Sequence, residues 1–123
     1  MLNIKKLLTK ILGCCYTQTA SGNWVYRKYA DGRFEGWYKS TATLTIGTAI
    51  GSLYQTASNS SISFPITLTE LTYADVKGNT SSYGVWSYLI TTSTSFVSYR
   101  LCSASSRASA SYNIAAYISG TWK

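Results

Sequence analysis

The chain has no histidine, one proline and only four acidic residues among its 123 positions. Hydrolytic and metal-dependent sites need side chains that titrate or coordinate metal, so this scarcity argues against catalysis. A pair of carboxylates can cleave a glycosidic bond. Here, however, Asp31 lies where a turn residue is expected, and Glu35 stands near Arg33 and Lys39, so turn formation and ion pairing explain both carboxylates more simply. We predict no enzyme activity, no catalytic residue, no metal site and no cofactor; a small glycan-cleaving enzyme that uses Glu35 or Glu70 is the alternative.

Cysteine is also scarce, and its pattern excludes a disulfide framework. The count of three is odd, and Cys14 and Cys15 are adjacent. We interpret these two and Cys102 as thiols of a protein that folds in a reducing cytosol. Residues 11–14 resemble a lipoprotein cleavage site, but Lys10 interrupts the apolar run before them, which argues against a signal peptide. No stretch is long and apolar enough to cross a membrane as a helix, so we expect no membrane insertion.

Basic residues outnumber acidic ones by eleven to four and give a net charge of +7. They are scattered along the chain, and they are interleaved with several aromatic residues only within residues 23–39. Because no nucleic-acid motif accompanies them, we expect no nucleic-acid partner. The positive balance favours anionic surfaces, including teichoic-acid-like or phospholipid polymers, through long-range attraction.

Residues 1–12 differ in pattern from the rest of the chain. Apolar residues recur there at helical spacing with polar residues between them, which predicts a short amphipathic helix. A helix of about 12 residues is marginal alone in water, so its apolar stripe needs a partner. The heptad positions fit a parallel bundle such as a trimer; packing on the chain's own β domain and lying on a membrane surface are the alternatives. The candidate oligomerisation residues are Ile4, Leu7, Leu8, Ile11 and Leu12.

Residues 13–22 have glycine at both ends and mostly small polar residues between them, which predicts a linker. A β domain is then expected over residues 23–123. Residues 23–39 indicate a β-hairpin, because two aromatic-rich runs flank Asp31 and Gly32. We predict surface loops or turns at residues 55–61 and 77–82.

The rest of this domain contains further short strand-like segments. Residues 108–118 alternate so that one face of the last strand carries Ala110, Tyr112, Ile114, Ala116 and Ile118. About seven or eight short strands at even spacing are typical of an antiparallel sandwich. We therefore predict an all-β fold, an antiparallel jelly-roll-like β-sandwich preceded by the short amphipathic α-helix.

Aromatic residues are abundant, with eleven tyrosines and four tryptophans among many Ser, Thr and Asn residues. Such side chains suit binding surfaces, because rings stack on sugars or apolar groups while hydroxyls and amides form hydrogen bonds. Most aromatic residues of a small β domain are nevertheless buried, and we expect Trp24 and Trp37 in the core or in subunit contacts. Residues near predicted turns are the candidate ligand-binding residues. They are Asn59, Asn79, Tyr83, Trp86, Tyr99 and Arg100.

Three segments resemble the short structural proteins of tailed bacteriophages, in particular the C-terminal head domains of tail-fibre or receptor-binding proteins. These segments are the apolar and lysine-rich residues 4–12, the aromatic hairpin within residues 24–37, and the ending at residues 117–123. The order of a Thr-rich strand, Phe64-Pro65-Ile66 and a Ser/Ala-rich loop is similar too. The resemblance covers nearly all of residues 22–123.

This resemblance implies a homotrimeric fibre tip that is made in the cytoplasm of the host bacterium and carried on the phage tail of the virion. It implies contact with other tail or baseplate proteins and binding to a bacterial surface saccharide or protein. No ligand residue transfers from the family to this chain. The alternative is a purely structural or accessory virion protein that binds no receptor.

Overall fold

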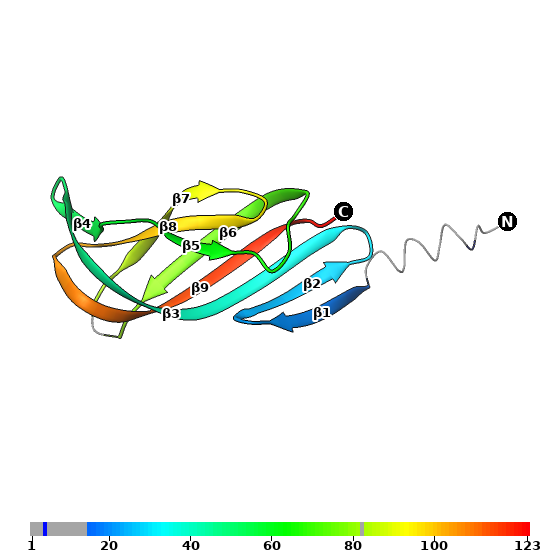
Figure 1. The fold of residues 1–123 in the computed structure, drawn as a ribbon, viewed down its shortest axis with the longest axis horizontal. Helices are drawn as coiled ribbons and strands as arrows, with labels where there is room; N and C mark the ends of the chain where they lie inside the picture. The colour runs from blue at the N-terminus through cyan, green and yellow to red at the C-terminus, as the bar shows by residue number, and fades with distance from the viewer. Residues whose placement is uncertain (1–3, 5–14, 82) are drawn as a thin grey trace.

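The computed structural model describes residues 4, 15–81 and 83–123, and nine strands within them form one curled antiparallel sheet (Figure 1). Residues rich in Thr, Ser, Tyr and β-branched side chains favour this extended backbone. The strands are β1 (Tyr16–Ser21), β2 (Trp24–Tyr29), β3 (Arg33–Ile50), β4 (Leu53–Thr56), β5 (Ser60–Ser63), β6 (Glu70–Asn79), β7 (Trp86–Thr92), β8 (Phe96–Ser103) and β9 (Arg107–Thr121).

The sheet folds over itself into two layers. One layer has the order β1-β2-β3-β9-β6, and in the other β8 pairs with β7 along one edge and with β5 and β4 along the other. Strand β3 joins the layers, because its first part pairs with β9 and its last part with β4. Strands β6 and β7 share no ladder among the described residues, so the curl stays open like a half-barrel.

The predicted all-β antiparallel fold is confirmed, but the predicted two-sheet sandwich is wrong. Residues 33–50 form the single long strand β3, whereas the sequence analysis predicted only short strands. Register shifts between Ile46 and Thr48 in its pairing with β4, and between Leu44 and Ile46 in its pairing with β9, mark β-bulges. A bulge bends a strand and increases its twist. One long bent strand can therefore serve both layers, so the sheet stays continuous.

Strand β9 carries the centre of the core, as its alternation predicts. Tyr112, Ile114 and Ile118 are each at most 2% exposed, and the alternate side chains of Asn113, Ala115 and Tyr117 face outward. The facing layer contributes Val97, Tyr99 and Leu101 from β8. The remaining buried hydrophobic residues of this cluster are Trp24, Phe34, Ile46, Ile62, Phe64, Leu68, Val76 and Ala116.

The hairpin of β2 and β3 forms where the sequence predicts it. Gly32 has a φ of +101°, and its amide donates to Tyr29 O at 3.0 Å. The amide of Arg33 donates to Asp31 Oδ1 at 3.1 Å, so Asp31 acts as the expected turn residue. The C-terminal segment joins this turn, because Trp122 N donates to Gly32 O at 2.9 Å.

Other predicted elements differ from the structure. The expected linker at residues 13–22 contains strand β1, the expected loop at 55–61 contains parts of β4 and β5, and the expected turn at 77–82 begins within β6. All three segments are polar, which indicated loops, but ladder pairing with β2, β8 and β9 satisfies their backbone groups.

The predicted helix lies outside the described residues except for Ile4, whose side chain is 67% exposed. The predicted roles of Leu7, Leu8, Ile11 and Leu12 therefore stay predictions. Within the described part of the chain, no helix has the length and apolar character needed to span a membrane.

Candidate functional site

On the outward face of β3, β9 and β6, side chains from three distant segments form rows that run across the strands. Lys39 on β3 and Lys77 on β6 are both paired with Ala115 of β9. Because neighbouring strands lie about 4.8 Å apart, the Cα atoms of the two lysines are roughly 10 Å apart with a small side chain between them. The next row along the strands is polar, since Thr41 and Asn79 both pair with Asn113.

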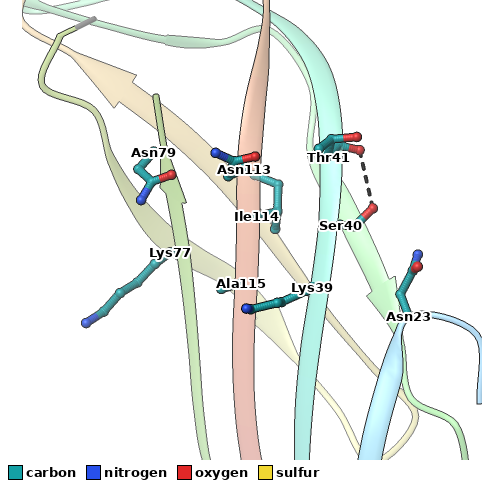
Figure 2. A pocket seen from close by; sticks show the side chains of 9 residues that line it. All are labelled: Asn23, Lys39, Ser40, Thr41, Lys77, Asn79, Asn113, Ile114 and Ala115. Atoms are coloured by element: carbon teal, nitrogen blue, oxygen red, sulfur yellow. Dashed lines mark hydrogen bonds between the residues drawn. The ribbon is translucent and has the colours of Figure 1, made fainter. Parts of the chain in front are cut away.

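These rows line an open groove of ≈ 730 Å³ (Figure 2). Lys39 extends towards β9 beside Ala115, whereas Lys77 extends away from that strand. The amide groups of Asn79 and Asn113 lie next to each other at the other end of the groove. The full lining is Asn23, Lys39, Ser40, Thr41, Lys77, Asn79, Asn113, Ile114 and Ala115.

The groove continues into an aromatic row. Trp37 and Tyr117 are paired across β3 and β9, with ring centroids 5.8 Å apart, and Tyr73 lies 6.0 Å from Tyr117. Trp37 is 37% exposed and Tyr73 is 55% exposed. A smaller hollow of ≈ 280 Å³ is lined by Trp37 and Tyr117 together with Lys39 and Lys77, and so connects the rings to the groove.

Contacts within the sheet hold this aromatic row in place. The guanidinium of Arg27 lies 5.2 Å from the Trp37 ring and 4.5 Å from the Tyr16 ring, and its Nε donates to Gln18 Oε1 at 2.9 Å. Burial and the neighbouring Glu35 raise the pKa of Tyr117. The Tyr117 hydroxyl is therefore neutral at ordinary pH and can donate a hydrogen bond.

Few carboxylates lie near the groove. Asp75 lies 3.9 Å from Lys77 Nζ, and the two side chains are 43% and 80% exposed. Such an exposed ion pair contributes little to stability and can rearrange. The described residues contain no ion pair to Lys39, because their two salt bridges join Arg33 to Asp31 and Lys77 to Asp75.

Two of the predicted ligand-binding residues come together near this site. Asn79 lines the groove, and with Trp86 it also lines a hollow of ≈ 380 Å³ between β6 and β7. Trp86 is 43% exposed. Neither position establishes a ligand contact, so both roles stay predictions.

The other candidates lie elsewhere. Arg100 Nε donates to Asn59 Oδ1 at 2.6 Å on the far layer. The hydroxyl of Tyr83 lies 2.6 Å from that of Tyr112, and Arg107 stacks on the Tyr83 ring at 3.8 Å. Tyr99, which we predicted to lie near a turn and to bind ligand, lies within strand β8 and is only 3% exposed, because β8 is covered by the opposite layer and flanked by β5 and β7.

Sequence reasoning missed most of the groove. It assigned Trp37 to buried contacts, and it did not single out Lys39, Lys77 or Asn113 as binding residues. The alternation of β9 already places Asn113 and Tyr117 on the face opposite the core. The sequence does not predict that β3 and β6 flank β9, because these two strands are far apart along the chain.

The carboxylates considered for catalysis do not converge. Asp31 pairs with Arg33 at 2.9 Å, and hydrogen bonds from Arg33 lower its pKa. Glu35 accepts a hydrogen bond from the Tyr29 hydroxyl at 3.2 Å. Glu70 lies on β6, with β9 between it and β3. Among the residues that the structure describes, no three His, Cys, Asp or Glu side chains are grouped in a way that could hold a metal ion.

Comparison with protein-family models and with curated proteins gives no match. Comparison with solved structures matches an N-truncated R1-type pyocin tail fibre, with a TM-score of 0.67 and 14% identity over 98% of both chains. The fold is that of a pyocin tail fibre. A P. aeruginosa R1 pyocin fibre containing C-terminal residues gives a TM-score of 0.64 at 16% identity, and an N-truncated R2-type fibre gives 0.59 at 16%.

The pyocin comparison confirms the predicted tail-fibre resemblance at the level of the fold. It covers 98% of this chain for the R1 fibre and 94% for the R2-type fibre, but only 32% and 42% of those two longer fibre chains. At such low identity the comparison supplies no functional residues. The groove therefore has to be judged by its own chemistry.

Proposed function

We propose that this chain is a tail-fibre or tail-tip head domain that binds a bacterial cell-surface receptor without catalysis. The observation that carries the proposal is the pyocin tail-fibre fold, which matches over 98% of this chain and 98% of the R1-type fibre. A fold alone does not imply function, so the outward face of β3, β9 and β6 supplies the chemical argument.

That face suits a saccharide better than a flat protein contact. Trp37 and Tyr117 offer ring faces, and Asn79 and Asn113 offer amides that donate and accept hydrogen bonds. Rings combined with adaptable polar groups are typical of binding surfaces. The scattered carboxylates argue that the ligand is bound and not cleaved.

The proposal also covers the oligomeric state of the chain and its attachment to the virion. We propose a homotrimer whose contacts include Ile4, Leu7, Leu8, Ile11 and Leu12, attached to other tail or baseplate proteins on the virion after synthesis in the bacterial cytoplasm. The support is the heptad-like pattern of residues 1–12.

Adsorption to bacteria tests the receptor-binding role. The full-length chain, labelled with a fluorophore, should bind saturably to cells of at least one strain in a diverse panel, or to spots of a bacterial glycan array. Chain denatured by heat is the control. Saccharide fragments should not be released from the cells, and Glu35→Gln and Glu70→Gln should adsorb as the wild type does.

The second candidate is a purely structural virion protein. It is favoured by exposed apolar side chains on a second surface, where Trp86, Tyr88 and Ile90 of β7 are 37–43% exposed. Contacts between virion subunits would cover such residues. This candidate predicts no adsorption to any strain and no array signal, whatever the oligomeric state.

A further inference from the structure

The groove across β9 contains a cation that the fold does not neutralise. Lys39 extends over the groove floor beside Ala115 (Figure 2). Among the described residues it forms no ion pair, whereas Lys77 on the opposite rim lies 3.9 Å from Asp75. An ammonium group in a concave surface concentrates negative ligands there.

The nearest ring faces lie on the same surface of the same strand. Trp37 precedes Lys39 by two residues, so their Cα atoms are about 7 Å apart at the usual rise of a strand. Both side chains line the hollow that also contains Tyr117 and Asp75, and the carboxylate of Asp75 is paired with Lys77. A sugar ring stacked on Trp37 would therefore place an acidic substituent, its own or that of the next unit, close to Lys39.

The other end of the groove offers amide groups for hydrogen bonding to a ligand. In Figure 2 the one hydrogen bond among the drawn residues joins Ser40 Oγ to Thr41 O at 3.3 Å, so the amides of Asn79 and Asn113 do not bond to each other. They can serve the hydroxyl groups of any sugar. A neutral sugar, which offers hydroxyl groups alone, would not need the ammonium group of Lys39. An acidic sugar would.

We propose that this groove binds an acidic saccharide, with a sugar ring against Trp37 and a carboxylate or phosphate group at Lys39. The inference rests on the proposed receptor-binding function and adds the charge class of the receptor and the residue that selects it.

Equilibrium binding of the full-length chain to three probes tests this inference. The probes are a poly(glycerol phosphate) teichoic acid that carries glucose substituents, an alginate oligosaccharide and neutral dextran. Lys39→Gln is compared with Lys123→Gln, which removes the same charge from the exposed C-terminal residue away from the groove. Thermal melting of both variants verifies that they are folded.

We expect an acidic probe to bind more tightly than dextran and to weaken as salt is raised, because salt screens exposed charges. Lys39→Gln should weaken binding by about tenfold, the usual effect of losing a charge-assisted hydrogen bond, and Lys123→Gln by less than about twofold. Preference for the teichoic acid would assign phosphate, and preference for alginate would assign carboxylate.

Equal binding of dextran, or equal affinities of the two lysine variants, would overturn the inference. Cell adsorption that persists while both acidic probes fail and Lys39→Gln adsorbs normally would overturn it too, but would leave the receptor-binding function standing. Absence of adsorption to any strain or array would remove the proposed function itself.

Discussion

Trp24 and Trp37 belong to one hairpin but face opposite sides of the sheet. Trp24 is 5% exposed, its Nε1 donates to Ser63 O at 3.0 Å, and its ring contacts Phe64 edge-on at a centroid distance of 6.0 Å. Trp37 is 37% exposed beside Tyr117. The same residue type therefore serves the core in one position and an outer surface in the other.

Trp24→Ala should lower the free energy of unfolding by about 3–5 kcal/mol, because it leaves a cavity between the layers. Trp37→Ala is the matched control in the same hairpin and should cost less than about 1 kcal/mol in the monomer, since an exposed ring loses little packing. Urea denaturation measures both. Equal losses would mean that Trp37 is buried in the assembled protein, as the sequence alone had suggested.

Ionisation of Tyr112 should lower the stability of the folded protein at alkaline pH. Burial, and then its hydrogen bond with Tyr83, raise the pKa of Tyr112 from the ordinary 10.0 to about 12. A group whose pKa is higher in the folded state contributes stability below its unfolded pKa and loses it as the pH rises through the folded pKa. The contribution of Tyr112 to stability should therefore be constant up to pH ~10 and fall between about 10 and 12.

Denaturation measured across this pH range checks the expectation. Tyr112→Phe cannot ionise and should show a shallower decline than the wild type. If both proteins lost stability with the same pH dependence, the decline would have another origin, such as Tyr99 or Tyr117, whose pKa values burial also raises.

At the scale of elements, β9 is the strand on which the molecule depends. It pairs with β3 along one edge and β6 along the other, and its two faces supply the core and the groove floor. Among the described residues, strand β1, in contrast, pairs only with β2, and it is exposed throughout. Changes in β9 should therefore affect both stability and binding, whereas changes in β1 should affect stability little.

Gly120→Ala tests the pairing of β9 with β6. A Cβ at Gly120 would lie 2.1 Å from Glu70 O, a backbone atom, so the two strands would have to separate. We expect a loss of about 1–3 kcal/mol or more, the range of overpacking. Gly84→Ala, where a Cβ meets nothing within 4 Å, is the control and should change stability by less than about 0.5 kcal/mol. Thermal melting of Gly120→Ala like that of Gly84→Ala would contradict this close approach.

The sequence predicted local structure better than the assembly of strands. Alternation identified the buried face of β9, and Asp31 with Gly32 identified the β2–β3 turn, because both signals are local. The prediction of a surface loop failed for Gln55 and Thr56, which are only 8% and 3% exposed although they are polar. Their burial depends on the pairing of β4 with the distant strand β8. The groove was missed for the same reason: β3 and β6 meet only through β9.

At the scale of the whole molecule, the pattern of residues 1–12 is compatible with the proposed assembly of three chains. Sedimentation equilibrium of the full-length protein at micromolar concentration should give three times the chain mass of 13.5 kDa. Leu7→Lys should dissociate it, because a charge enters the apolar stripe. Thr9→Ala, outside the stripe, should leave the mass unchanged. A stable wild-type monomer would contradict the trimer.

The central claim is that the outward face of β3, β9 and β6 binds a bacterial surface. Adsorption of the full-length chain to susceptible cells, compared between Trp37→Ala and Ile90→Ala, tests it most directly, because these two large apolar residues are similarly exposed on different layers, at 37% and 40%. We predict that Trp37→Ala loses at least about tenfold in affinity while it stays folded, and that Ile90→Ala adsorbs normally. Normal adsorption of Trp37→Ala would contradict the account.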